Sequence, residues 1–173
     1  MSEKHSTIIN SYLSFKLGEE VFAAHASKVL NILEMCKVTE VPRAPEYMKG
    51  IINLRGTVLP IIDLRQKLGM SPSEKTANTC IIVLDITMGD ESVLVGAIVD
   101  AVSAVLEFDK TELMPPPSIG SKYRSEFIFG VANINETFIM VLDMDAIFSV
   151  DEISILRDKT VETKEKEKIE EIA

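Results

Sequence analysis

The sequence predicts a mainly β protein in which two small barrels, each of about five strands, arise by internal duplication and pack around a shared hydrophobic core. The first observation is a repeated segment: residues 50–64 are GIINLRGTVLPIIDL, and residues 130–144 align with them without a gap as GVANINETFIMVLDM. The second observation is a further match between residues 27–35 and residues 100–108. The third is that short apolar segments alternate with turn signals, so only few short helices are expected. Such recurrence indicates a supersecondary unit built twice.

The first elements of the chain are expected to be a hairpin and a strand. Residues 12–17 and 21–24 are apolar segments on either side of Gly18, which predicts a β-hairpin with a short turn. Residues 26–33 are expected to form one helical turn that leads into a strand. Pro42 and Pro45 then predict a rigid extended connector, because proline neither continues a helix nor fits a central strand.

The repeated segment predicts a second hairpin, formed by residues 50–54 and 57–62, with its turn at Arg55-Gly56. Gly56 is expected at positive φ, and the Asn53 side chain is expected to bond its own backbone. Asp63 is placed to cap a short helix over residues 64–68. The equivalent residues of the second copy, Asn133 and Asp143, are expected to have the same structural roles.

The second half of the chain repeats this plan after a polar loop. Strands are predicted at residues 80–86 and 93–99, and the second copy carries an insertion between Pro115 and Gly130. The regularly spaced apolar residues of the two matched segments are expected in the core. These residues are Val29, Ile32, Val102 and Val105.

These elements divide the chain into a single domain with two tails. The domain is expected over residues 12–150, with halves at about 12–75 and 78–150 that are either intertwined or adjacent. Residues 1–11 are expected to be an N-terminal tail. Residues 151–173 are rich in mixed charge, which predicts a charged helix or a disordered tail.

Composition and motifs exclude several classes of function. The net charge of −9 argues against binding to nucleic acid or to anionic membranes, both of which depend on basic residues. No apolar segment is long enough to predict a membrane helix. Cys36 and Cys80 have no second ligand nearby, so neither a metal nor a cofactor is expected. The chain also has no P-loop, nucleophile elbow or dinucleotide glycine motif.

Over about residues 11–150, the chain resembles the CheW family of chemotaxis coupling proteins. The resemblance rests on Pro42 and Pro45, on the segments 50–56 (GIINLRG) and 60–65 (PIIDLR), and on matches from Val95-Gly96 to Pro116-Pro117. It implies a pair of SH3-like β-barrels and a non-catalytic adaptor. It further implies that this adaptor couples the CheA histidine kinase, through its regulatory domain, to the cytoplasmic tip of methyl-accepting receptors in bacterial chemotaxis. Such a protein is cytoplasmic and is recruited to receptor arrays at the membrane.

The resemblance also implies which residues bind partners. Arg55, at the tip of a tight turn, is the first candidate, because a guanidinium suits carboxylates and carbonyls of a partner. Gly50 and Gly56 would shape this hairpin, and Val29 and Asn31 would add contacts. Asn31 is neutral where the family is commonly acidic, so a coupling protein of an auxiliary chemosensory pathway with a non-motility output is the alternative.

Asp63 and Asp143 allow a hypothesis from a different class. Carboxylates at equivalent places of a duplicated fold could form a hydrolase dyad of the aspartic-protease kind, in which two carboxylates share a proton. However, those enzymes continue from Asp with Thr or Ser and then Gly, whereas this chain has Asp63-Leu64-Arg65. Helix capping is therefore the preferred interpretation of both residues.

Overall fold

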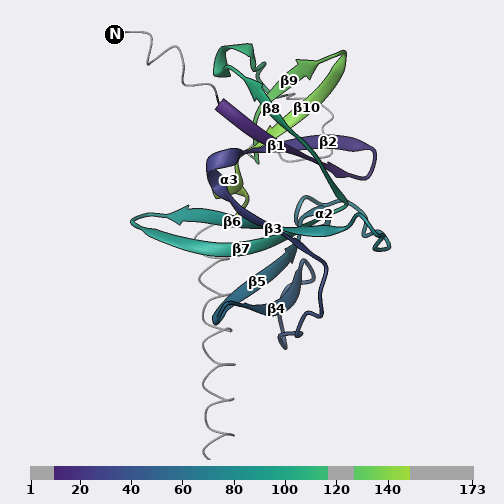
Figure 1. Cartoon of the computed structure of the whole chain (residues 1–173), viewed down its shortest axis with the longest axis vertical. Coiled ribbons are helices and arrows are strands. Elements are labelled where there is room, and N and C mark those ends of the chain that lie inside the picture. The colour runs from purple at the N-terminus through teal and green to yellow at the C-terminus, as the bar shows by residue number, and fades with distance from the viewer. Residues whose placement is uncertain (1–9, 117–126, 149–173) are drawn as a thin grey trace, which may run out of the picture.

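The computed structural model describes residues 10–116 and 127–148, and these form two five-stranded sheets with a few short helical segments between the strands (Figure 1). The predicted mainly β class is confirmed. The predicted tails, apart from residues 10 and 11, and most of the insertion between Pro115 and Gly130 lie outside the described residues.

The sheet that we name sheet A has the strand order β8-β1-β2-β10-β9. All neighbours are antiparallel except β2 and β10, which run parallel. The strands are β1 (Asn10–Leu17), β2 (Glu20–His25), β8 (Ala101–Phe108), β9 (Ile128–Ile134) and β10 (Thr137–Leu142).

Sheet B has the order β3-β6-β7-β5-β4, again with a single parallel pair, β5 with β7. Its strands are β3 (Val29–Glu34), β4 (Met48–Leu54), β5 (Thr57–Asp63), β6 (Cys80–Met88) and β7 (Glu91–Val99).

The two copies of the duplicated unit are intertwined. Within each sheet, the first hairpin of one copy lies beside three strands of the other copy, and the order is the same in both sheets. The chain crosses between the sheets after β2, through the short helical turn η1 (Ala26–Lys28), and again from β7 directly into β8. Neither half of the sequence therefore contains all the strands of one sheet.

Three hydrophobic clusters account for the packing. The largest lies between the sheets and contains Phe15 and Phe22 of sheet A together with Ile82 and Leu84 of sheet B. The opposite face of each sheet has its own smaller cluster, centred on residues such as Tyr12 in sheet A and Ile61 in sheet B. Each sheet therefore curls around a small hydrophobic core of its own, and the two sheets share the larger core between them.

Two apolar residues predicted in the core lie at the surface instead. Ile32 of β3 is 44% exposed and Val105 of β8 is 63% exposed, whereas Val29 and Val102 are half-buried. The reason is that β3 is an edge strand of sheet B and β8 is an edge strand of sheet A, so a regular apolar spacing does not ensure that a neighbouring strand covers these side chains. The core prediction was wrong for Ile32 and Val105.

The two equivalent hairpins turn in the same way. Arg55 and Gly56 have φ of 51° and 83°, and Asn135 and Glu136 have φ of 52° and 65°. Positive φ at both central residues of a two-residue loop is the type I′ turn, whose twist matches that of the flanking strands. Gly56 adopts this conformation without strain, whereas Glu136 carries a Cβ in the left-handed region.

Glu136→Gly is therefore expected to stabilise the protein. Relief of the left-handed strain, about 1–2 kcal/mol, exceeds the added backbone entropy of glycine, about 0.5–1 kcal/mol. The expected net gain is about 0.5–1 kcal/mol in the free energy of unfolding, measured by urea denaturation. Asn135→Gly is the matched control and should gain less, because Asn tolerates positive φ. A loss of stability in Glu136→Gly would contradict the assigned turn.

Candidate functional site

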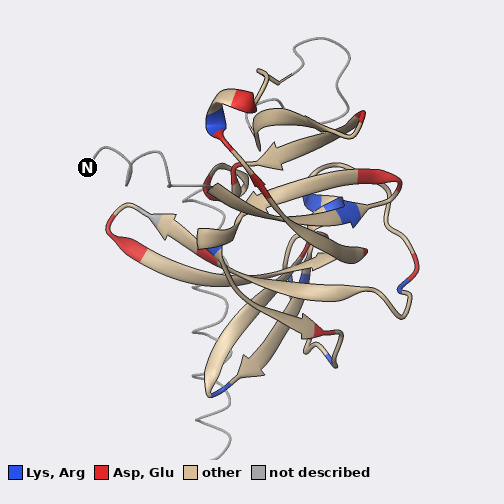
Figure 2. Ribbon diagram, turned by 45° about the horizontal axis from the view of Figure 1, so that its top comes forward, with Lys and Arg blue, Asp and Glu red and all other residues tan. Residues whose placement is uncertain are grey.

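Arg55 lies at the exposed tip of the β4–β5 hairpin. The tip is held by a hydrogen bond in which the Gly56 N–H donates to Asn53 Oδ1 at 2.8 Å. Figure 2 shows this tip in blue, whereas the tip of the hairpin formed by β6 and β7 is red. The guanidinium is thus presented at the end of a rigid hairpin, an arrangement suited to carboxylates or carbonyls of a partner.

Gly50 supports the base of the same hairpin. It is buried, with φ of 144°, and its backbone lies directly against Thr39 of the preceding connector. Thr39 and Ile51 exchange two backbone hydrogen bonds of 2.9 and 2.8 Å. The connector is therefore fastened along the outer edge of β4, and Gly50 acts through backbone geometry rather than through a surface of its own.

Val29 and Asn31 lie on β3. Val29 is half-buried against the shared core, whereas Asn31 is exposed and its Oδ1 accepts a hydrogen bond from Ile32 N at 2.8 Å. Leu30 between them is 56% exposed, although the repeat pattern did not single it out. The exposed residues of β3 are thus Leu30, Asn31, Ile32 and Glu34, which present two apolar side chains, one amide and one carboxylate.

The predicted partner-binding residues all belong to sheet B. Val29 and Asn31 are on one edge strand, and Arg55 ends the other edge strand. The two edge strands contact the same hydrophobic core of sheet B, because Leu33 of β3 packs in the same cluster as Ile52 of β4. The residues therefore belong to one curled sheet rather than to two separate surfaces.

Asp63 and Asp143 lie in different parts of the fold. Asp63 Oδ1 accepts from Arg65 N at 3.0 Å and from Gln66 N at 3.4 Å, at the start of α2 (Leu64–Lys67). Asp143 Oδ1 accepts from Ala146 N at 3.2 Å, at the start of α3 (Met144–Ile147). The two carboxylates also line different pockets, so they do not form the dyad that a hydrolase of this kind would need.

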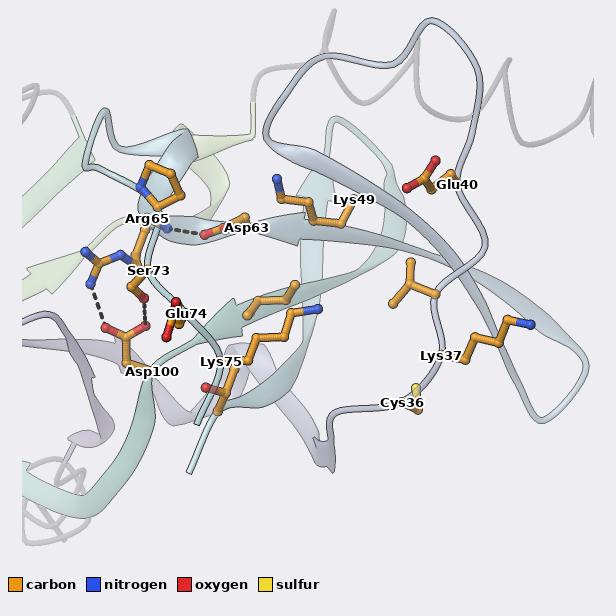
Figure 3. A pocket seen from close by; sticks show the side chains of 14 residues that line it. Cys36, Lys37, Glu40, Lys49, Asp63, Arg65, Ser73, Glu74, Lys75 and Asp100 are labelled. Carbon is orange, nitrogen blue, oxygen red and sulfur yellow. Dashed lines mark hydrogen bonds and ion pairs between the residues drawn. The ribbon is translucent and has the colours of Figure 1, made fainter. Parts of the chain in front are cut away.

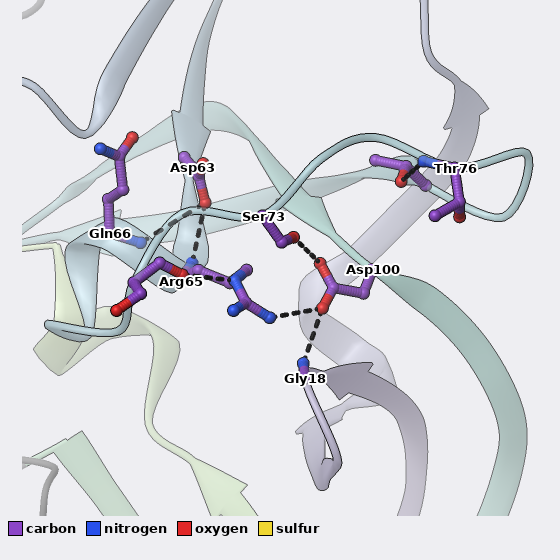
Figure 4. Close-up of polar contacts among 9 residues, drawn as sticks. Gly18, Asp63, Arg65, Gln66, Ser73, Thr76 and Asp100 are labelled. Atoms are coloured by element: carbon purple, nitrogen blue, oxygen red, sulfur yellow. Dashed lines mark hydrogen bonds and ion pairs between the residues drawn. The ribbon is translucent and has the colours of Figure 1, made fainter.

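A polar cluster around Asp100 links elements of both sheets (Figure 4). Asp100 Oδ2 accepts from Arg65 Nη1 at 2.7 Å and from Gly18 N at 2.6 Å. Arg65 Nε also donates to Ser71 O at 2.8 Å. The cluster connects α2, which follows sheet B, to the β1–β2 turn of sheet A, and so it has a structural role.

The pocket beside this cluster, of about 440 Å³, is lined by opposite charges that leave no excess of one sign (Figure 3). Its carboxylates include Asp63 and Asp100, both already engaged in the contacts described above. Its cations include Lys37 and Lys75. Within residues 10–116 and 127–148, no group of His, Cys, Asp and Glu could hold a metal ion.

The perturbed titratable groups have structural causes. Burial lowers the pKa of His25, with smaller contributions from Lys110 and Lys28, and the ring contacts Asn10 Oδ1 and Ser27 Oγ. Burial raises the pKa of the Cys80 thiol, which therefore stays protonated and is a poor nucleophile. Burial and the nearby Asp109 raise the pKa of Tyr12. None of the three has the features of an activated catalytic group.

The fold and the site together define a β-sheet binding module, built by duplication, whose candidate contacts lie on hairpins and edge strands. In the part of the chain that the structure describes, no helix is long and apolar enough to cross a membrane.

The profile of the CheW-like domain matches residues 11–152, and the chain belongs to this family. The chain is 37% identical over 137 residues to a probable chemotaxis protein CheW of Rhizobium etli, covering 79% of this chain and 86% of that protein. It is 36% identical over 140 residues to the chemotaxis protein CheW of Rhizobium meliloti, covering 81% and 88%. The crystal structure of the scaffolding protein TtCheW from Thermoanaerobacter tengcongensis matches with a TM-score of 0.75 and 30% identity, covering 86% of this chain and 93% of that one.

Proposed function

We propose that this chain is a non-catalytic chemotaxis adaptor that couples methyl-accepting receptors to the CheA histidine kinase. The observation that carries the proposal is the match of the CheW-like domain across both sheets, from residue 11 to residue 152. The similarity to TtCheW, which is described as a scaffolding protein, agrees with an adaptor role. The separate, helix-capping positions of Asp63 and Asp143 favour this role over hydrolysis.

Arg55 is the proposed centre of the partner-binding surface, with Val29 and Asn31 as further contacts. Arginine is enriched among residues that dominate binding energy at interfaces. An exposed guanidinium on a short type I′ turn also loses little backbone freedom on binding, because the turn is already ordered. Gly50 and Gly56 contribute by fixing the shape of the hairpin that carries Arg55.

The proposed partners are the regulatory domain of the kinase and the cytoplasmic tip of the receptors, which would recruit the adaptor from the cytoplasm to arrays at the membrane. Asn31 offers a neutral hydrogen-bonding group, which is typically about half as strong as a charged one. A coupling protein of an auxiliary pathway remains the second candidate because of this residue. The direct test is a pull-down of the full chain with its own kinase and receptor fragments. Absence of a complex with either fragment, at micromolar concentrations, would contradict the proposal.

Arg55→Asn is expected to weaken partner binding by about 1–3 kcal/mol while the fold is retained. The substitution copies Asn135, which adopts nearly the same φ in the equivalent hairpin, so the turn keeps a residue that tolerates left-handed backbone. The measurement is isothermal titration calorimetry with the kinase regulatory domain and with the receptor fragment.

Asn135→Arg is the matched control, because it places a guanidinium on the tip of the other hairpin. It should leave binding unchanged in the wild-type background and should not restore binding to Arg55→Asn. Unchanged affinity in Arg55→Asn, or a large fall in its melting temperature, would show that Arg55 does not have the role proposed for it.

A further inference from the structure

Sheet A carries an apolar groove that is separate from the Arg55 surface. The groove has a volume of about 520 Å³ and is lined mainly by apolar side chains of β2, β9 and β10 and of the segment before Pro116. Phe138, which is 60% exposed, and Met114, which is 41% exposed, stand along it. Exposed apolar side chains that line the same groove form a continuous apolar surface, which is a feature of binding sites.

The floor of the groove is rigid. Val131 of β9 belongs to the shared core, and Met140 of β10 packs against it. Met114 is tied to Val131 by two backbone hydrogen bonds of 2.8 and 2.9 Å. A partner segment would therefore meet a preformed surface and would not have to order the floor itself.

The rim of the groove is acidic. Ile139 is level with Val21 in the parallel pairing of β10 and β2, so the preceding residue, Phe138, is level with Glu20. Glu19 is exposed in the adjoining turn and also lines the groove. No Lys or Arg is among the described residues that line it. An exposed acidic group at one end of an apolar surface, here Glu19, favours a segment of opposite charge.

We propose that this groove docks a segment of a partner protein that presents a large apolar side chain next to Lys or Arg. The apolar side chain would lie against Phe138 and Met114, and the basic group would face the exposed carboxylate of Glu19. A second copy of this chain suits the groove less well, because two chains that each have a net charge of −9 repel each other.

The test is an NMR titration of the full-length, isotopically labelled chain with a short synthetic peptide that has one phenylalanine between lysines. We expect the signals of Val21, Met114 and Phe138 to shift, and the affinity to fall several-fold as salt is raised. The same peptide with glutamates in place of lysines should bind more weakly. Phe138→Ser should weaken binding of the lysine peptide about tenfold.

Phe129→Ser is the matched control, because Phe129 is 52% exposed on the same sheet but lines a different pocket, with Tyr12 and His25. It should leave the affinity unchanged. Glu19→Lys is a second variant that spares the apolar surface and should weaken binding several-fold even if Phe138→Ser folds poorly.

Three results would overturn the inference. They are equal binding of the two peptides, unchanged binding in both Phe138→Ser and Glu19→Lys, or a dimer in light scattering that Phe138→Ser abolishes, which would make a second copy the occupant. None of these measurements uses the kinase or the receptor, so their outcome is independent of the adaptor role.

Discussion

Gly50→Ala is expected to destabilise the protein by about 3 kcal/mol or more, or to prevent its folding. A Cβ at this position would lie 2.1 Å from Thr39 O and 2.8 Å from Val38 Cγ1, both far inside van der Waals contact. The φ of 144° adds strain for any residue with a side chain. Relief would require the connector to detach from β4, with loss of the two hydrogen bonds between Thr39 and Ile51. Denaturant unfolding monitored by circular dichroism measures the loss.

Two other glycines of the duplicated unit provide graded controls for this prediction. At Gly130, the counterpart of Gly50, a Cβ would lie 3.0 Å from Leu113 Cβ, so Gly130→Ala should be milder. At Gly56 a Cβ would meet nothing within 4 Å, and only the positive φ of 83° opposes it. Gly56→Ala should therefore lose about 1 kcal/mol. A loss in Gly50→Ala no larger than that in Gly56→Ala would show that the connector does not pack against β4.

The hairpin and the helix of the duplicated unit could be predicted from the sequence, because turns and helix caps depend on residues that are close together in the chain. The Arg55-Gly56 turn lies between short apolar segments, and Asp63 precedes a helix-forming segment. Both patterns depend on neighbours a few residues apart in the chain, and so they predict the β4–β5 hairpin and the helix after it without knowledge of the tertiary fold. The structure has both elements, with α2 ending one residue earlier than the predicted helix.

The intertwining of the copies could not be predicted in the same way. It depends on which strand lies beside β2 and β7, and the parallel neighbours of these strands come from distant parts of the sequence. A pattern of apolar residues identifies a strand but not its partner. The exposure of Ile32 and Val105 has the same cause, since only the strand order reveals that β3 and β8 are edges.

The groove beside Phe138 also depends on tertiary structure. Phe138 occurs in a run of apolar residues in β10, where Ile139 and Val141 are almost completely buried. Its exposure follows from the position of the strand end relative to the core, which the sequence does not specify. The Arg55 surface differs in this respect, because a guanidinium in a two-residue turn is expected at the surface in any fold.

Asp100→Ala is expected to destabilise the protein by about 2–3 kcal/mol. The substitution removes the acceptor of two short hydrogen bonds, from Arg65 Nη1 at 2.7 Å and from Gly18 N at 2.6 Å. The Arg65 side chain is only 14% exposed, so its charge would remain largely desolvated without its carboxylate partner. Because the Asp100 side chain is itself 28% exposed, the loss should stay below that of a fully buried ion pair. Urea denaturation measures it.

Two further variants separate the charge from the hydrogen bonds. Asp100→Asn retains an oxygen that can accept from Gly18 N, so it should lose less than Asp100→Ala. In the double variant Arg65→Met with Asp100→Ala, the unpaired guanidinium is gone, and the loss should be smaller than the sum of the two single losses. Additive losses would show that Arg65 and Asp100 do not stabilise the fold as a pair.

A second ion pair, between Lys28 and Asp145, provides the control, because like the first it joins the two halves of the chain. Asp145, the counterpart of Arg65, lies 2.7 Å from Lys28 Nζ and also accepts from Thr87 N at 2.9 Å. The side chains of Lys28 and Asp145 are 26% and 35% exposed, so solvent screens this pair more than the first. Lys28→Met is therefore expected to lose about 1 kcal/mol or less. An equal loss in Lys28→Met and Asp100→Ala would contradict the assignment of the larger stabilisation to Asp100, because burial is what distinguishes the two pairs.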